Sequence, residues 1–109
     1  MKPRSSKRAL ALAISPETKE KVWSRDGGRC VFCGTRFWVA PEAHFIPRSK
    51  GGLGIEQNVL TLCRRCHDRF DNGKQYDREV MRDYFEDYLE DHYPDWDESK
   101  LIYHKEGNK

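Results

Sequence analysis

Four cysteines are the residues of this sequence whose type and spacing most clearly predict chemistry. They form two C-x2-C pairs, Cys30 with Cys33 and Cys63 with Cys66, separated by 29 residues. A C-x2-C turn points two sulfurs at one centre, and two such turns complete a tetrahedron around zinc. Since no coordination position would stay open, we predict a structural zinc whose binding contributes to folding. Redox-active pairs and free core cysteines are the alternative interpretations.

Three polar residues follow one another around these pairs. His44 lies between the pairs, Asn58 precedes the apolar stretch that leads to Cys63, and His67 directly follows Cys66. A lone histidine is most often an ordinary surface or core residue. An imidazole with a pKa near 6.5 can also accept a proton or bind a metal near neutral pH. Both histidines lie close in the chain to the predicted metal scaffold, which favours a functional role.

The charge of the chain is distributed unevenly. Residues 1–75 carry 15 Lys and Arg against 7 Asp and Glu, a balance of +8, and residues 76–109 carry 5 against 11, a balance of −6. A basic first part favours a polyanionic partner such as DNA, with a solubilising surface as the alternative. Such contacts bind backbone phosphates and read no sequence. The predicted nucleic-acid-binding residues are Arg25, Arg29, Arg48, Lys50, Arg64, Arg65 and Arg69.

The elements that must position these residues can be predicted from local signals. Ser15 and Pro16 predict a helix start, and Gly27 and Gly28 predict its end, with Val22 and Trp23 facing the core. We expect two extended pieces broken at Pro41 over residues 37–46, followed by a glycine-rich loop over residues 47–54. We then expect a short strand or helix start over residues 58–62 and a helix over residues 64–73.

A chain of 109 residues with 37% hydrophobic and 35% charged residues is expected to form one domain with a modest core. We divide it into a basic N-terminal arm (1–14), a core (15–75) and an acidic C-terminal helix and tail that pack on the core (76–109). The helix is expected over residues 77–92, with an apolar stripe of Val80, Met81, Tyr84, Phe85, Tyr88 and Leu89.

No membrane partner is expected, because no stretch is long and apolar enough to span a bilayer. The apolar run over residues 9–14 follows a basic start, but its six residues are too few for a signal peptide. We therefore expect no export and a reducing compartment, where paired cysteines more often hold metal than form disulfides.

The segment SRDGGRCVFCG…EAHFIPRSKGGLGIEQNVLTLCRRCH resembles the HNH nuclease family, in the branch with a four-cysteine zinc. The resemblance covers roughly Trp23 to Gly73. It implies an α+β fold, with a small zinc-stapled ββα-metal (treble-clef-like) core and flanking N- and C-terminal helices. The chain is also similar to small phage-encoded HNH proteins, which implies the cytoplasm of a bacterial host cell.

The family's functional residues can be carried over to matching positions of this sequence. The resemblance implies that His44 is the general base, that Asn58 steadies the loop and orients the base, and that His67 is a ligand of a catalytic divalent ion. That ion would be Mg²⁺, Mn²⁺ or Ni²⁺, separate from the structural zinc.

One position departs from the family pattern. The family places an acidic or histidine ligand before the general base, and this sequence has Ala43 there. Asp71 lies one helical turn after His67, at the spacing where the colicin branch has a second histidine, and is our preferred replacement. Glu42 is the weaker alternative, because strand alternation should turn it to the face opposite Ala43 unless Pro41 bends the chain.

These features predict a metal-dependent DNA endonuclease that hydrolyses phosphodiester bonds, nicks one strand and has low sequence specificity. A non-catalytic zinc-stabilised module that binds nucleic acid is the second interpretation. A component of a phage packaging assembly, bound to packaging proteins, is compatible with either.

Overall fold

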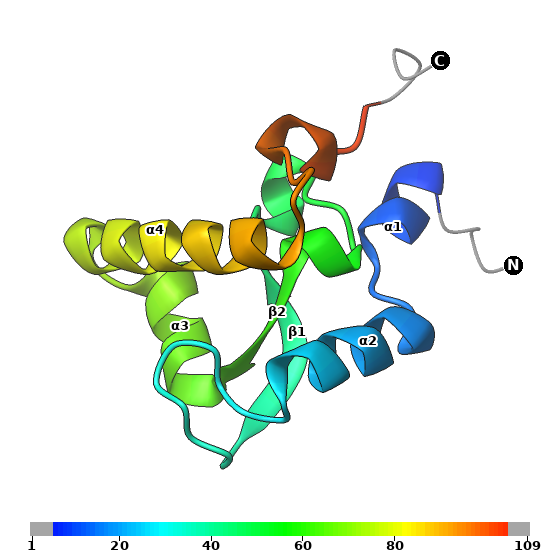
Figure 1. The fold of residues 1–109 in the computed structure, drawn as a ribbon. Helices are drawn as coiled ribbons and strands as arrows, with labels where there is room; N and C mark the ends of the chain where they lie inside the picture. Colours follow the sequence, from blue (N-terminus) through cyan, green and yellow to red (C-terminus); the bar gives the residue numbers. More distant parts are fainter. Residues whose placement is uncertain (1–5, 105–109) are drawn as a thin grey trace, which may run out of the picture.

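The computed structural model describes residues 6–104 of the chain. A two-strand antiparallel sheet lies at the centre, with α3 and α4 on one side and α2 on the other (Figure 1). This arrangement confirms the predicted α+β class. The elements are α1 (Lys7–Leu12), α2 (Pro16–Asp26), β1 (Val39–His44), η1 (Arg48–Lys50), η2 (Glu56–Asn58), β2 (Val59–Cys63), α3 (Arg64–Asn72), α4 (Gln75–His92) and η3 (Glu98–Leu101).

Helix α2 begins and ends at the residues that the sequence predicts. The Ser15 hydroxyl accepts a hydrogen bond from the backbone N–H of Thr18, and Gly27 ends the helix in a left-handed conformation with φ 69°. Val22 is fully buried as expected, but Trp23 is exposed, which corrects the expectation for that side chain. The indole of Trp23 lies instead against Gly28 at the surface.

The N-terminal segment is not simply a basic arm. Residues 7–12 form α1, and the side chain of Leu12, the last residue of this helix, is buried. The backbone N–H of Gly54 donates to the Ala11 carbonyl at 3.0 Å, and Arg8 donates to the Arg48 carbonyl at 3.3 Å. The predicted arm of residues 1–14 is therefore corrected to a docked helix over residues 7–12, and residues 1–5 lie outside the described part.

The two strands pair with one irregularity. Ala40 lies opposite Leu62 and Ala43 lies opposite Leu60, so the strand carries a bulge between these pairs, at Pro41 and Glu42. Proline cannot donate a ladder hydrogen bond, which makes a bulge the natural place for it. The two extended pieces predicted around Pro41 are thus one bulged strand.

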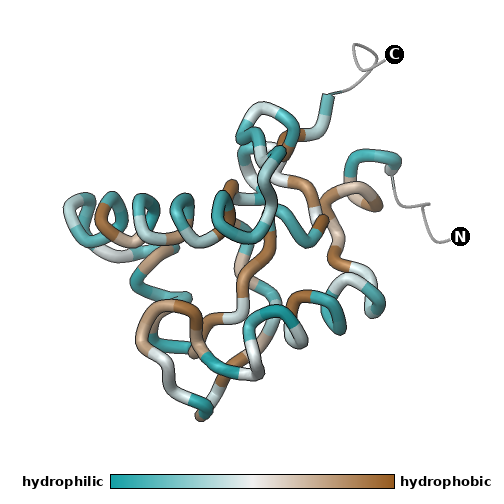
Figure 2. The backbone as a smooth tube through the Cα atoms, in the orientation of Figure 1, coloured by the Kyte–Doolittle hydropathy of each residue, from teal (hydrophilic) through white to brown (hydrophobic). Residues whose placement is uncertain are grey.

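Helix α4 closes the core with a narrower stripe than predicted. Met81, Phe85 and Leu89 are buried, whereas Val80 and Tyr84 are exposed. Figure 2 shows the hydrophobic residues of the strands at the centre of the molecule and hydrophilic residues along most of α4. Beyond α4 the tail folds back, with Leu101 buried.

Within the described residues, no helix combines the length and hydrophobicity that crossing a bilayer requires.

Candidate active site and metal centre

The four cysteines converge on one point, as the spacing predicts. The sulfurs of Cys30, Cys33, Cys63 and Cys66 all lie within 4.8 Å of one another, and those of Cys33 and Cys63 are 3.7 Å apart. A tetrahedral zinc with bonds of about 2.3 Å holds its sulfurs about 3.8 Å apart. The cluster therefore fits a closed structural metal site of the kind that zinc occupies.

Local backbone geometry builds each half of this cluster. The backbone N–H of Cys33 donates to the Cys30 sulfur, and that of Cys66 donates to the Cys63 sulfur, at 3.5 Å and 3.4 Å. Burial opposes ionisation of Cys30, but backbone donors outweigh it and lower its pKa to about 7. Burial and the neighbouring sulfurs raise the pKa of Cys66. Four adjacent thiolates therefore require a cation to neutralise them.

His44 ends β1 and is half-buried, with its Nε2 2.9 Å from the Leu12 carbonyl oxygen. A carbonyl oxygen can only accept, so Nε2 carries the proton and Nδ1 is left with a free lone pair. Burial lowers the pKa of His44 below its ordinary value, and the positive charge of Arg48 acts in the same direction. The imidazole is therefore held neutral, in a single tautomer, at neutral pH.

His67 and Asp71 lie one turn apart on α3, and their side chains meet. His67 Nε2 is 3.3 Å from Asp71 Oδ2. Two ligands at right angles on an ion with bonds of about 2.1 Å lie about 3.0 Å apart. The pair therefore has the spacing of two neighbouring ligand atoms on one small divalent ion. Among the described residues, only the cysteines form a cluster of three or more close ligand atoms.

His44, His67 and Asp71 share one cleft, which we call the His44 cleft. Glu42 lines the same cleft but is exposed and pairs with Lys19 at 3.3 Å. The side chains of Glu42 and Ala43 lie on opposite faces of β1, as alternation predicts, since Glu42 is exposed and Ala43 is buried. Glu42 and His44 line the same cleft. Alternation therefore gives no ground for excluding Glu42, and the choice between Asp71 and Glu42 stays a prediction. Ala43, 1% exposed, packs in the core and offers no ligand.

Asn58 is fully buried and fastens the loop that follows His44. Its Oδ1 accepts from the Ile46 N–H at 2.8 Å, and its Nδ2 donates to the carbonyls of Ile46 and Leu53 at 3.2 Å and 2.8 Å. Its own carbonyl accepts from the Phe45 N–H at 2.7 Å. A side chain at Gly52 would collide with the Ile46 carbonyl, so this loop can close only over glycine.

Sequence reasoning missed the wall of the His44 cleft that faces these residues. Gln75, Arg78 and Arg82 of α4 line it, although α4 belongs to the acidic part of the chain. The Arg82 guanidinium lies over the Phe45 ring and bonds Glu98. Arg78 is exposed. The spacing of Gln75, Arg78 and Arg82 by three and four residues places them on one face of the helix and could have predicted this wall. The negative net charge of residues 76–109 hid the two arginines on that face.

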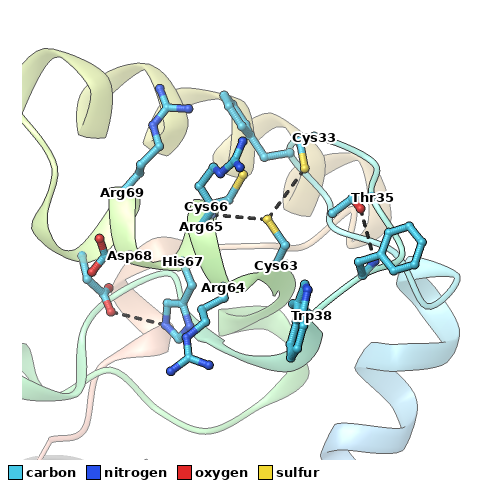
Figure 3. Close-up of a pocket in the computed structure, with 13 residues that line it drawn as sticks. Cys33, Thr35, Trp38, Cys63, Arg64, Arg65, Cys66, His67, Asp68 and Arg69 are labelled. Atoms are coloured by element: carbon cyan, nitrogen blue, oxygen red, sulfur yellow. Dashed lines mark hydrogen bonds and ion pairs between the residues drawn. The ribbon is translucent and has the colours of Figure 1, made fainter.

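Most predicted phosphate-binding residues are exposed, and Arg48 and Lys50 line the His44 cleft. Arg64, Arg65 and Arg69 line a second cleft beside the cysteines, which we call the zinc-side cleft (Figure 3). His67 and Asp71 line both clefts, so the two clefts meet at this pair. Exposed Arg29 lines neither.

Arg25 is the exception and corrects the prediction. Its side chain is only 9% exposed and donates to Asp26, to the Glu56 and Val59 carbonyls and to the Tyr93 hydroxyl. Burial opposes its charge, but pairing with Asp26 outweighs burial and keeps the pKa of Arg25 above its ordinary value. Arg25 therefore ties α2 to β2 and the C-terminal part, and is not available to DNA.

Two comparisons with known proteins bear on this site. A family model described as HNH endonuclease matches residues 30–85, the segment that contains both cysteine pairs and both cleft histidines. The protein named anaredoxin, from Nostoc sp. (strain PCC 7120 / SAG 25.82 / UTEX 2576), is 31% identical over 58 residues. That match covers 53% of this chain and 76% of the Nostoc protein.

Proposed function

This chain belongs to the HNH endonuclease family, and we propose that it is a metal-dependent DNA endonuclease in which His44 is the general base. It hydrolyses phosphodiester bonds, leaves 5′-phosphate and 3′-hydroxyl ends, and nicks one strand with low sequence specificity. The observation that carries this proposal is one cleft that holds both the His44 imidazole, oriented by the Leu12 carbonyl, and the His67–Asp71 pair.

His44 takes the proton of the attacking water. Its Nε2–H is already engaged by the Leu12 carbonyl, so Nδ1 is the atom that accepts this proton. The lowered pKa of His44 keeps that nitrogen unprotonated before the reaction. After the transfer the imidazolium keeps its hydrogen bond to Leu12, which stabilises the added charge.

Asn58 acts as a positioning residue for this base. It does not reach the reacting atoms, because its side chain is buried and all its polar atoms bind the loop backbone. By holding Ile46 it fixes the chain that leaves His44, just as the Leu12 carbonyl fixes the ring. The base is thus held at both ends.

His67 and Asp71 would hold the catalytic divalent ion, which is Mg²⁺, Mn²⁺ or Ni²⁺. When bound, such an ion supplies a Lewis acid that stabilises charge on the phosphate and on the leaving 3′ oxygen. Two protein ligands suffice for Mg²⁺, which commonly completes its shell with waters and substrate phosphates. Asp71 is preferred to Glu42 because it lies against His67, whereas Glu42 is paired with Lys19.

The DNA backbone would lie along the His44 cleft and the zinc-side cleft, which meet at His67 and Asp71. Arg48 and Lys50 approach it from the loop, and Arg64 and Arg65 from the start of α3. Basic residues in the first turn of a helix oppose its dipole, so these two arginines cost stability where they stand. A role in phosphate binding explains their position, and such contacts carry no sequence information.

A non-catalytic zinc-stabilised nucleic-acid-binding module is the second candidate function. Burial of Ala43 favours it, because the ligand that the family places there is missing and nothing at that position can replace it. A role in phage packaging is compatible with either function. His44 distinguishes the two, since a module without catalysis has no need of a neutral, singly oriented imidazole in a cleft.

The test is the His44→Ala variant, compared with the wild-type chain in DNA nicking and in DNA binding. Removal of a general base should slow cleavage by about 10²–10⁴-fold. Binding should stay within a few-fold, because the phosphate contacts come from other residues. If His44→Ala cuts DNA at the wild-type rate, the proposed base is wrong, and if neither protein cuts, the binding module is favoured.

A further inference from the structure

Two aromatic side chains project from the loop between the first cysteine pair and β1. Trp38 is 80% exposed and Phe37 is 76% exposed. Burial in the core would stabilise such rings, and exposed apolar groups of this size mark interaction sites when they gather together. The proposed mechanism uses neither residue.

The backbone holds this pair outward. Trp38 has φ 57°, and no other non-glycine residue in residues 6–104 has a positive φ. A left-handed conformation is unfavourable for a residue with a side chain and persists only where its surroundings enforce it. Here the Trp38 carbonyl accepts from the Arg64 N–H at 2.9 Å, and Val39 pairs with Cys63. The loop is thus fixed to the start of α3 and to a metal ligand.

The surroundings of the pair are basic and lead to the proposed active site. Trp38, Phe37, Arg64 and Arg65 line the zinc-side cleft, which continues to His67. Figure 3 shows Trp38, Arg64 and His67 among the side chains that line this cleft. Aromatic rings beside arginines match nucleic acid, which offers phosphates to the guanidinium groups and base faces to the rings.

We propose that Trp38 and Phe37 form a platform on which unpaired DNA bases stack, next to the phosphate that the His44 cleft receives. This inference rests on the proposed function for its placement on DNA. In a duplex the bases already stack on one another and their faces are not accessible, so the platform gives a preference for DNA with a single-stranded segment. The exposed rings, the fixed left-handed backbone and the adjacent arginines together support it.

The test is equilibrium binding with no divalent ion added, so that it does not depend on catalysis. The full chain is titrated against a fluorescent oligothymidine of about 16 nucleotides, the upper end of single-strand site sizes, and against a blunt duplex. Stacking on an aromatic residue is worth about 5- to 150-fold in affinity per base. Trp38→Ala should weaken oligothymidine binding by this factor and leave duplex binding within about twofold.

Two variants control for side effects. Trp38→Phe keeps an aromatic face and should retain most of the oligothymidine affinity. Tyr76→Ala removes a ring that is 75% exposed on α4 and lines neither cleft, so it should change nothing. Zinc content and melting temperature establish that each variant is folded.

Three outcomes would overturn the proposal. In the first, Trp38→Ala leaves both affinities at their wild-type values. In the second, Trp38→Ala lowers both affinities equally, which would make Trp38 a general DNA contact. In the third, Trp38→Ala abolishes self-association of the wild-type chain in sedimentation while DNA binding is unchanged. The pair would then be an interface with a second copy. Absence of nuclease activity alone would leave this binding test intact and refute only the proposed function.

Discussion

Substitution of Gly54 by alanine should slow catalysis by displacing the partner of the general base, His44, although Gly54 itself is not part of the proposed site. A Cβ at Gly54 would lie 2.0 Å from the Ala13 carbonyl oxygen and 2.8 Å from that of Leu12. Such a Cβ needs at least 3.0 Å, so the end of α1 must move by about 1 Å. The hydrogen bond from His44 Nε2 to Leu12, now 2.9 Å, would break. A misplacement of about 1 Å can cost about 10²-fold in rate.

The assay is single-turnover nicking of supercoiled plasmid at saturating metal, at a temperature where the variant is folded. Overpacking should also destabilise Gly54→Ala by about 1–3 kcal/mol. Gly27→Ala is the matched control, because Gly27 has φ 69° with no atom within 4 Å of its Cβ position. It should lose about 1–2 kcal/mol through backbone strain alone and nick normally. A folded Gly54→Ala protein that nicks at the wild-type rate would refute the role of α1 in orienting His44.

Four further predictions concern the metals, the base and the DNA surface. Protein purified under reducing conditions without added zinc should contain about one equivalent by metal analysis, and disulfides without metal would refute the closed site. Asp71→Asn should raise the Mg²⁺ or Mn²⁺ concentration needed for half-maximal nicking while zinc stays bound, and Glu42→Gln should raise it less. A larger increase in Glu42→Gln than in Asp71→Asn would make Glu42 the ligand. Because burial lowers the pKa of His44 and a base must be unprotonated, nicking should rise with pH along an acid limb centred below about 6.5 and then level off. A limb centred well above this value would indicate another base. Arg78→Ala should weaken DNA binding uniformly across sequences and reduce the salt slope by about one, and an unchanged slope would remove Arg78 from the interface.

The metal-binding half of the site could be predicted because its information is local. Two C-x2-C turns determine where their own sulfurs point, and His67 follows Cys66 on a helix that places Asp71 one turn later. The caps of α2 are likewise local, since Ser15 and Gly27 act on their own neighbours. Spacing along the chain was therefore sufficient for these features.

The rest depends on contacts between distant residues, which no local pattern encodes. The partner of His44 is the carbonyl of Leu12, 32 positions earlier, and a backbone carbonyl carries no residue signature. Both Arg25 and Arg48 lie in the basic part of the sequence and were predicted to bind DNA, yet Arg25 is bound by Asp26 and Tyr93. The net charge of residues 76–109 is a sum over all faces of α4, so it hid the basic residues on the face that lines the His44 cleft.

The central claim is that this cleft cuts DNA with a divalent ion. Conversion of supercoiled plasmid to open circles, with Mg²⁺, Mn²⁺ or Ni²⁺ added or withheld and with zinc content checked in each sample, tests it most directly. We predict open circles with at least one of these ions and none after chelation, while the zinc stays in place. Plasmid that stays supercoiled with every ion, in the presence of folded, zinc-loaded protein that binds it, would contradict the account.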